Sequence, residues 1–233
     1  MWVKNLARRG LRRLVVELGV QLHYAQGAIG ERTLPQFANQ PERLIIDLPR
    51  RIINPERMSF GNDVRLGPGC FIIAVKEYPP SDFRQPDKPH QPQQFSSQIR
   101  IGDRVTSSGN LVMGAAQRIE VGDDVMFAAN VTVLDNLHGF EHPYEPYKYQ
   151  PLQKIAPVRI GRGCWIGENV VILPNVEIGE MSIIGANSVV TRSVPERSIA
   201  VGAPARIIKQ WHEEAGSWRA FLEPRKARAN FRG

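Results

Sequence analysis

The chain has 233 residues and a formal net charge of +7, and its length allows one substantial core. Two cysteines indicate neither a disulfide framework nor a zinc site, and no apolar run reaches the roughly 18 residues that a membrane span needs. Basic residues gather near the two ends instead of alternating with aromatic residues, which argues against nucleic acid as a partner. No secretory signal pattern is visible, so we expect a cytoplasmic protein.

Residues 1–43 form a lead-in with one predicted helix at residues 2–22. This helix places its apolar side chains on one face, opposite four arginines: Arg8, Arg9, Arg12 and Arg13. A basic amphipathic helix is typical of peripheral association with an anionic membrane, here at its inner face. The alternative interpretation is that the apolar face packs on the first coil of the fold or on a neighbouring subunit.

A six-residue repeat occupies residues 160–195. Each unit opens on an aliphatic residue: Ile160, Ile166, Ile172, Ile178, Ile184 and Val190. The fifth residue of each unit is small: Cys164, Val170, Val176, Ser182, Ser188 and Val194. A period of six is neither the 3.6 of a helix nor the 2.0 of a strand. It predicts an all-β fold, a parallel β-helix in which three units make one coil of a three-sided prism.

The first and fifth side chains of each unit would point into the narrow interior of this prism. The same register recurs upstream, beginning with Phe60, so we expect one β-helical domain over residues 44–207. The pattern weakens between Ile101 and Val121. Ser107 stands there at an expected aliphatic position, and two extra residues precede Val121.

Three segments depart from the repeat. Residues 76–98 hold five prolines, and residues 134–158 interrupt the pattern in the same way, so we expect two loops ejected from the prism. Loops of this kind cost little entropy and often carry function. Residues 208–233 have a helical and basic pattern, which predicts a short C-terminal helix followed by a basic tail.

None of the five histidines falls inside a recognisable hexapeptide: His23, His90, His138, His142 and His212. Zinc bound on a β-helix needs imidazoles that project from adjacent coils, so we expect no metal. Two of the histidines, His138 and His142, lie in the second ejected loop. An imidazole, whose unperturbed pKa is about 6.5, can take a proton from an attacking hydroxyl near neutral pH.

Three strings carry a resemblance to a known family: VTVLDNLHG at 131–139, CWIG at 164–167 and VGAPARIIK at 201–209. Over about residues 58–210 the chain resembles the hexapeptide-repeat acyltransferases of left-handed β-helix fold. The likeness is greatest to the sugar O-acetyltransferases of galactoside, maltose and nodulation-factor type and their relatives in surface polysaccharide synthesis. It implies a homotrimer that binds acetyl-CoA between neighbouring prisms and takes a carbohydrate acceptor.

The resemblance also implies roles for particular residues. His138 matches the catalytic histidine, and three residues near it would contact the acceptor: Asp135, Asn136 and His142. Asn136 stands where many relatives have a histidine. The residues that would bind the acyl donor are Trp165, Gly167, Gly185, Ala186, Thr191, Arg192, Arg206 and Lys209. The last four would lie near the anionic nucleotide end of coenzyme A.

The implied mechanism is direct transfer. His138 would remove the proton from an acceptor hydroxyl as its oxygen attacks the thioester, and backbone N–H groups near Gly167 would stabilise the oxyanion. Two alternatives stay open. An N-acetyltransferase of an amino sugar would need the same base and groove, and a catalytically inactive β-helical scaffold of a polysaccharide assembly complex would need neither.

Overall fold

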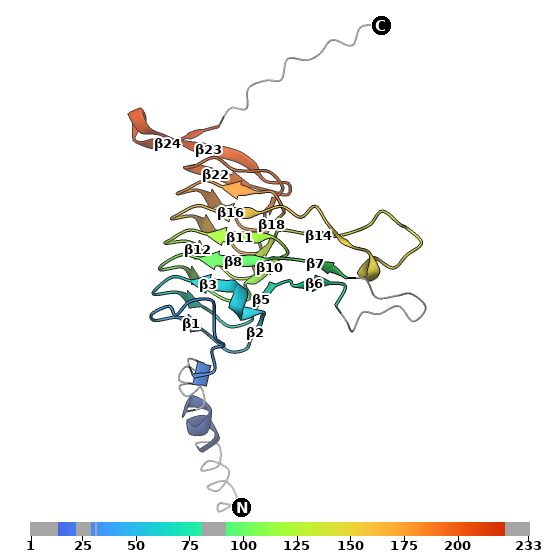
Figure 1. The fold of residues 1–233 in the computed structure, drawn as a ribbon. Helices are drawn as coiled ribbons and strands as arrows, with labels where there is room; N and C mark the ends of the chain where they lie inside the picture. Colours follow the sequence, from blue (N-terminus) through green and yellow to red (C-terminus); the bar gives the residue numbers. More distant parts are fainter. Residues whose placement is uncertain (1–13, 22–28, 31, 81–91, 222–233) are drawn as a thin grey trace, which may run out of the picture.

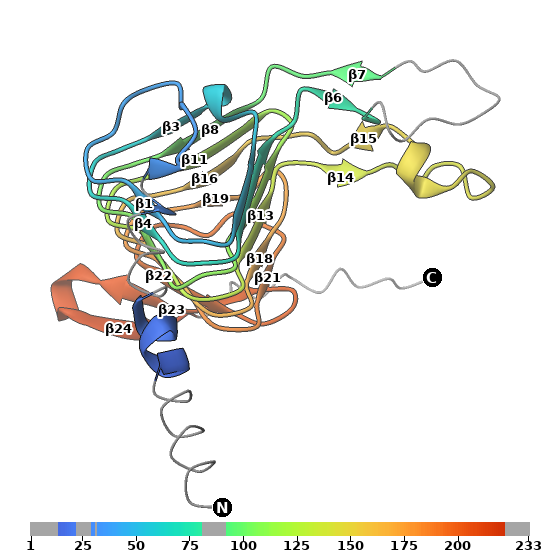
Figure 2. The ribbon, with the colours of Figure 1, turned by 90° about the horizontal axis from the view of Figure 1, so that it is seen from below.

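The computed structural model describes residues 14–21, 29–30, 32–80 and 92–221, and its body is a three-sided parallel β-helix. Figures 1 and 2 show the stacked coils from the side and along the axis. Each coil runs through a first, a second and a third face in turn. We call the edges between successive faces the 1–2, 2–3 and 3–1 corners.

The strands of the three faces are short, and every pair before β23 is parallel. The first face contains β1 (Ile45–Ile46), β4 (Arg65–Leu66), β9 (Thr106–Ser107), β12 (Met126–Phe127), β17 (Trp165–Ile166), β20 (Ile183–Ile184), β22 (Ser198–Val201), β23 (Arg206–His212) and β24 (Ser217–Ala220). The second contains β2 (Arg50–Ile53), β5 (Cys70–Ala74), β10 (Val112–Ala115), β13 (Thr132–Leu134), β18 (Val171–Ile172) and β21 (Val189–Val190). The third contains β3 (Met58–Phe60), β8 (Gln98–Ile101), β11 (Arg118–Val121), β16 (Val158–Ile160) and β19 (Glu177–Ile178).

The remaining elements lie outside the faces. They are a helix at residues 14–21, further helical residues at 29–30 and 32, two antiparallel pairs and three 3₁₀ turns. The pairs are β6 (Glu77–Tyr78) with β7 (Gln93–Gln94), and β14 (Leu137–His138) with β15 (Leu152–Gln153). The 3₁₀ turns are η1 (Pro55–Arg57), η2 (Tyr147–Tyr149) and η3 (Glu213–Ala215).

The interior follows the predicted register. The first and fifth side chains of the six repeat units at 160–195 are all buried, with at most 5% of their surface exposed. Interior serines bond to nearby carbonyls: the Ser182 hydroxyl lies 2.8 Å from the Pro195 oxygen, and that of Ser188 lies 2.6 Å from the Gly185 oxygen. The small fifth position therefore accepts polar atoms because the corner backbone beside it supplies acceptors.

The weak stretch between Ile101 and Val121 belongs to the same prism. Ser107 is buried there, and its hydroxyl accepts the N–H of Gly109 at 3.2 Å. Trp165 pairs with Ile183, so 18 residues complete that coil, whereas Thr106 pairs with Met126 after 20. The two extra residues widen the 2–3 corner after β10.

Asp135 holds this widened corner. Its carboxylate, with no exposed surface, accepts the N–H groups of Ala116 at 2.7 Å, Gln117 at 2.7 Å and Arg118 at 2.6 Å. The Asn136 side chain donates to the same carboxylate at 2.9 Å. The irregular coil is stable because one buried side chain replaces the backbone acceptors that a regular corner would supply.

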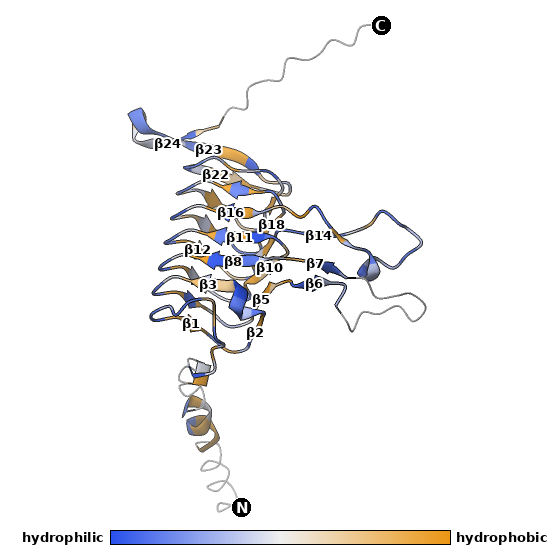
Figure 3. Ribbon diagram, viewed as in Figure 1, coloured by the Kyte–Doolittle hydropathy of each residue, from blue (hydrophilic) through white to orange (hydrophobic). Residues whose placement is uncertain are grey.

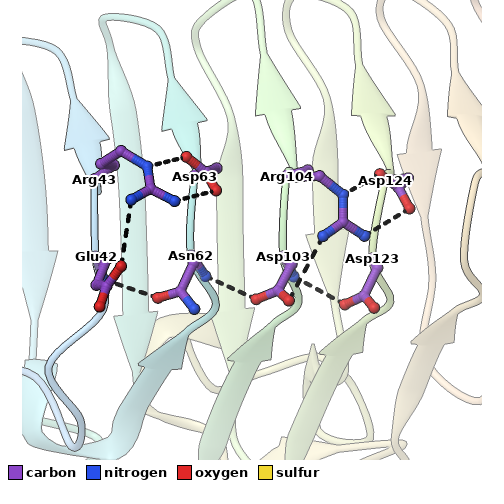
Figure 4. Close-up of polar contacts among 8 residues, drawn as sticks. All are labelled: Glu42, Arg43, Asn62, Asp63, Asp103, Arg104, Asp123 and Asp124. Carbon is purple, nitrogen blue, oxygen red and sulfur yellow. Dashed lines mark hydrogen bonds and ion pairs between the residues drawn. The ribbon is translucent and has the colours of Figure 1, made fainter.

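Polar side chains align the coils at the 3–1 corner (Figure 4). Side-chain oxygens accept backbone N–H groups from the coil before: Glu42 N–H to Asn62, Asn62 N–H to Asp103 and Asp103 N–H to Asp123. Two bidentate ion pairs run beside them: Arg43 with Asp63 and Arg104 with Asp124. Hydrogen bonds from Arg104 hold the pKa of Asp124 below its ordinary value. These pairs are exposed to solvent, so each adds little stability.

The outward rows of the second and third faces differ in polarity. Figure 3 colours the ribbon by hydropathy and shows hydrophilic residues in β8 and β11 of the third face. Neighbouring strands of the second face carry a partly exposed, mostly apolar outward row, which follows the exposed Arg51 of β2: Phe71, Val112, Thr132, Val171 and Val189. The corresponding row on the third face is polar: Ser59, Arg100, Glu120, Arg159 and Glu177. Arg159 donates to Glu120 at 3.0 Å within it. A charged face suits water, whereas the second face presents an apolar surface.

The prediction of a short C-terminal helix is wrong for residues 208–220. This segment belongs to the antiparallel strands β23 and β24, with the rings of Trp211 and Trp218 edge to face at 5.6 Å. β23 pairs with β22, the last strand that the coils contribute to the first face. The open edge of β22 supplies backbone partners that a helix would leave unpaired, so strand pairing overrides the local helical pattern. Residues 222–233 lie outside the described residues.

The N-terminal helix is described only at residues 14–21. Its apolar side chains are exposed by 46–65%: Leu14, Val15, Val16, Leu18 and Val20. This part of the helix is therefore not packed on the first coil of its own chain. Residues 2–13 and 22 of the predicted helix lie outside the described residues. No helix in the described ranges is both long and apolar enough to cross a membrane.

We predict that Asp135→Ala destabilises the fold by on the order of 3 kcal/mol or more, because it leaves three backbone N–H groups without their acceptor. Urea denaturation followed by circular dichroism would measure this. Asp124→Asn is the matched control, since it removes an exposed ion pair, suits the positive φ of this position and should cost less than about 1 kcal/mol. Equal losses in the two variants would contradict the assignment of Asp135 to the corner.

Candidate functional site

Both ejected loops leave the prism at the 2–3 corner, and Figure 2 shows them extending side by side from it. An apolar cluster at their base joins them: Tyr78, Ala116 and Leu152, with Val75, Phe95 and Ile155 packed around these. The loops continue strands of the second face, β5 for the first and β13 for the second. The rigid prism therefore sets where the residues of the loops lie.

His138 is exposed at the start of the second loop, between two anchored residues. Asp135, three residues earlier, is bonded to the corner, and Gly139 directly after it is buried. The Gly139 N–H donates to the Pro151 oxygen at 2.8 Å, and a Cβ at Gly139 would lie 2.5 Å from that oxygen. Only glycine allows this close approach. The imidazole therefore stands exposed on a fixed piece of backbone.

The two neighbours Leu137 and His138 face opposite sides of β14, as successive strand residues do. The imidazole packs against Tyr78 of the first loop, with ring centroids 5.1 Å apart and planes at 67°. Leu137 lines a cavity of about 560 Å³ on the other side, together with Lys154, Ile155, Ala156, Leu173, Pro174, Asn175 and Thr191. His138 and Thr191 thus share a corner, but the imidazole is not part of the cavity wall.

The three residues expected to contact the acceptor have different environments. Burial leaves Asp135 no surface for an acceptor, so we assign its carboxylate to the fold instead. The Asn136 amide donates to Asp135 and to the Gly114 oxygen at 3.2 Å. The side chain of His142 is exposed, and its backbone N–H and oxygen are both bonded to the buried Gln150 side chain.

Two of the residues expected to bind the acyl donor lie in one row on the first face. Strand register aligns Met126, Trp165, Ile183, Ile199 and Lys209 along the axis of the prism. Met126 and Trp165 are 46% and 48% exposed. The row is apolar until it ends on the Lys209 ammonium. Such a surface matches a long ligand with a weakly polar arm and an anionic end.

Gly167, Gly185 and Ala186 lie at the adjoining 1–2 corner. A Cβ at Gly167 would be 2.7 Å from the Ala186 nitrogen, so this corner is tightly packed. The expected oxyanion donor needs correction, because the Gly167 N–H already donates to Ile184 and the Gly185 N–H to Ala200. These two groups belong to the bonding between coils. The exposed Arg206 lies further along the same face, on β23.

The sequence-predicted residues therefore form two groups within one chain. His138, Thr191 and Arg192 lie at the 2–3 corner, since the last two directly follow β21. Trp165, Lys209 and the remaining donor residues lie on the first face, at the 1–2 corner or on β23. The second face separates the two groups. One chain by itself does not bring the imidazole to the row that contains Trp165.

The two cysteine thiols lie inside the prism and are not exposed nucleophiles. Burial raises the pKa of both Cys70 and Cys164 to about 11, so neither is a thiolate near neutral pH. The Cys164 thiol lies 3.1 Å from the Gly179 oxygen. In the described part of the chain, no three His, Cys, Asp or Glu side chains are grouped so that they could hold a metal ion.

The repeats match a known family model, Bacterial transferase hexapeptide (six repeats), over residues 157–192. Over these residues the chain is similar to hexapeptide-repeat transferases, and the match falls on coils of the β-helix. The repeat itself predicted this resemblance, whereas the contact of Tyr78 with His138 was not predicted. One signal in the sequence could have indicated this contact. Both ejected loops follow strands of the same face, so they leave the prism at the same corner.

Two curated relatives come from Escherichia coli strain K12. WbbJ, which is named as a lipopolysaccharide biosynthesis O-acetyl transferase, is 35% identical over 131 residues, covering 53% of this chain and 63% of WbbJ. The galactoside O-acetyltransferase is 36% identical over 120 residues, covering 50% of this chain and 56% of that protein. The matches thus span little more than half the length of these relatives.

A solved structure shares the fold at lower identity. It is AntD, an N-acyltransferase from Bacillus cereus in complex with dTDP and 3-hydroxybutyryl-CoA. The TM-score is 0.60 at 23% identity, and the match covers 77% of this chain and 86% of AntD. At this identity the likeness shows the fold alone.

Proposed function

We propose that the protein is an acetyl-CoA-dependent O-acetyltransferase that acts on a sugar hydroxyl in surface polysaccharide or lipopolysaccharide biosynthesis. The observation that carries this proposal is the exposed imidazole of His138, fixed between the anchored residues Asp135 and Gly139. The identity to WbbJ and to the galactoside O-acetyltransferase supports the choice of a hydroxyl acceptor. We infer also that the coils are left-handed, as the resemblance to this family implies.

His138 is the general base in this mechanism. Its neutral imidazole takes the proton of the acceptor hydroxyl while the hydroxyl oxygen attacks the thioester carbonyl of acetyl-CoA. The C–S bond then breaks, and the imidazolium returns the proton to the departing thiolate of coenzyme A. A base of this kind contributes roughly 10²–10⁴-fold in rate, and the positioning of the two substrates supplies much of the remainder. No acyl-enzyme is needed, which agrees with the burial of both cysteines.

The acyl donor binds along the first face in this proposal. Trp165 would cover the pantetheine arm where the tightly packed glycine corner lets a ligand approach the backbone. Lys209 and Arg206 would meet the phosphates, because both side chains are exposed cations at the end of this face. Thr191 and Arg192 lie at the other corner and would reach a donor held by a different chain.

The division of the site is the reason to propose a homotrimer. His138 of one chain meets the Trp165 row of the next chain when prisms associate side by side. The apolar outward row of the second face supports this arrangement, because a face in permanent contact with water would be expected to carry polar side chains as the third face does. Rotational symmetry then makes every site identical.

We also propose that the enzyme acts in the cytoplasm, next to the inner face of the membrane. Leu14, Val15 and Leu18 lie on one side of the described helix, and all three side chains are exposed. Four arginines precede it in the sequence: Arg8, Arg9, Arg12 and Arg13. We propose that the helix rests on an anionic membrane surface, which would place the enzyme near a lipid-borne acceptor.

His138→Ala is expected to lower the rate of acetyl transfer by roughly 10²–10⁴-fold, because the base is lost. The assay measures release of the coenzyme A thiol, and mild alkali distinguishes an ester product from an amide. Binding should persist: coenzyme A at 100 times its dissociation constant stabilises a protein by about 2.7 kcal/mol, seen as a thermal shift. His212→Ala, an exposed histidine on β23, is the control. Near-normal turnover in His138→Ala would refute the mechanism, and absence of any shift in the wild type would favour a scaffold.

Complementation between variants tests the shared site. His138→Ala and Trp165→Ala homotrimers should each be inactive, yet trimers refolded from an equal mixture should regain about a quarter of wild-type activity, since each heterologous interface pairs intact halves one time in four. The control mixes His138→Ala with the double variant His138→Ala/Trp165→Ala. This mixture should regain no activity, because no chain carries His138. If mixed trimers form, as light scattering and mass spectrometry would show, but no activity returns, the site lies within one chain.

Vesicle co-sedimentation tests the membrane proposal. The full chain should bind vesicles of phosphatidylcholine with phosphatidylglycerol, less so at high salt because ions screen the arginines. Leu14→Glu with Leu18→Glu should abolish binding, while Ile208→Glu, which alters an exposed apolar residue on β23, should not. Equal binding to pure phosphatidylcholine, or a changed oligomeric state in the Leu14/Leu18 double variant, would overturn the proposal.

A further inference from the structure

The first ejected loop makes direct contact with the residues that surround His138. We propose that Tyr78 and Gln93 of this loop form a clamp that positions the His138 imidazole for catalysis. The catalytic part of this inference rests on the proposed function, whereas the clamp itself is a statement about contacts. Both residues act through His138, so they are positioning residues.

Tyr78 and Gln93 are partners on neighbouring strands. They face each other across the β6–β7 pair. The Gln93 amide bonds both backbone groups of Leu152: its Nε2 donates to the carbonyl at 3.2 Å and its Oε1 accepts the N–H at 2.7 Å. The Gln93 side chain thus makes the two backbone hydrogen bonds to Leu152 that a neighbouring strand would otherwise make. Leu152 is the residue paired with His138 in β14–β15, so Gln93 fixes the backbone opposite the imidazole.

Tyr78, the cross-strand partner of Gln93, forms the second half of the clamp. Its hydroxyl donates to the Lys148 oxygen of the second loop at 2.8 Å, and only 8% of the residue is exposed. Anchored at that end, the phenol ring presents its π-system to the imidazole at a centroid distance of 5.1 Å and 67°. This edge-to-face geometry is the preferred one for aromatic pairs.

This ring contact bears on the orientation of the base. A catalytic imidazole is usually oriented by a hydrogen bond from a third group. Within the described residues the His138 ring has no hydrogen-bond partner of its own, and the carboxylate of Asp135, three residues earlier, is bonded to the corner. Packing against Tyr78 is therefore what restricts the rotamer of His138. The His138 side chain is nevertheless exposed, so a substrate can reach it.

The kinetic test compares Tyr78→Leu with Tyr78→Phe. We expect Tyr78→Leu to lower kcat by about ten- to hundredfold through misplacement of the base, with the KM for acetyl-CoA within about twofold of wild type. Tyr78→Phe keeps the ring and should retain most of the rate. Tyr144→Leu, at a fully exposed tyrosine of the second loop, is the matched control. Gln93→Leu should lower kcat, while Gln94→Leu, whose amide donates to Glu77 on its own loop, should not.

A double-mutant cycle separates positioning from general loop stability. If Tyr78 acts through His138, Tyr78→Leu should cause no further loss of rate in a His138→Ala background. Equal proportional losses with and without His138 would overturn the positioning role. So would a KM for acetyl-CoA that rises as much as kcat falls, or a Tyr78→Phe variant as impaired as Tyr78→Leu.

An NMR measurement tests the clamp without reference to activity. Histidine ring protons of the labelled full chain are recorded, and the His138 signal is identified by its loss in His138→Ala. Ring-current effects of Tyr78 should displace this signal in the wild type and in Tyr78→Phe but not in Tyr78→Leu. An unchanged signal in Tyr78→Leu refutes the clamp. If the His138 signal differs between the wild type and Tyr78→Leu but the wild type transfers no acetyl group, the clamp is supported and the proposed function is refuted.

Discussion

Backbone hydrogen bonds between stacked coils are the interaction on which the rest of this structure depends. Each short strand bonds to the equivalent strand of the next coil, as the N–H of Gly161 does to Ile178 at 2.7 Å and that of Gly179 to Val194 at 2.8 Å. The coils can stack in this way only if the interior stays narrow. One aliphatic and one small side chain per hexapeptide satisfy that condition, which is why the repeat is visible in the sequence.

This constraint determines where irregular structure is allowed. A coil cannot absorb extra residues in its faces without breaking the bonding to its neighbours, so additions occur at corners. The two-residue insertion at 116–117 needs the buried Asp135 carboxylate to satisfy its N–H groups. The longer insertions leave the prism completely, and side chains of the first loop bond to the second. The exposed His138 therefore combines the fixed backbone of a solenoid with the access to solvent of a loop.

The same prism also explains why the expected site residues are divided. Strands of one face are close in space but far apart in sequence, and consecutive strands turn away from each other at every corner. Trp165 and Lys209 are 44 residues apart in the sequence but align because successive coils bring the chain back to the first face. His138 lies on another edge of the prism. A prism has three edges, and residues on different edges can meet only across the boundary between two molecules. The apolar second face is consistent with such a boundary.

The sequence by itself determined the fold class, the interior residues of the repeat and the likeness to hexapeptide-repeat transferases, because a periodic interior requires a periodic sequence. It also located the exposed histidine and the two ejected loops. Tertiary structure alone decided the role of Asp135, the pairing of residues 206–210 with the edge of β22, and the contact of Tyr78 with His138. Each of these joins segments that no local pattern connects. Their physical cause is the satisfaction of backbone groups and ring surfaces by whichever distant segment the coils bring alongside.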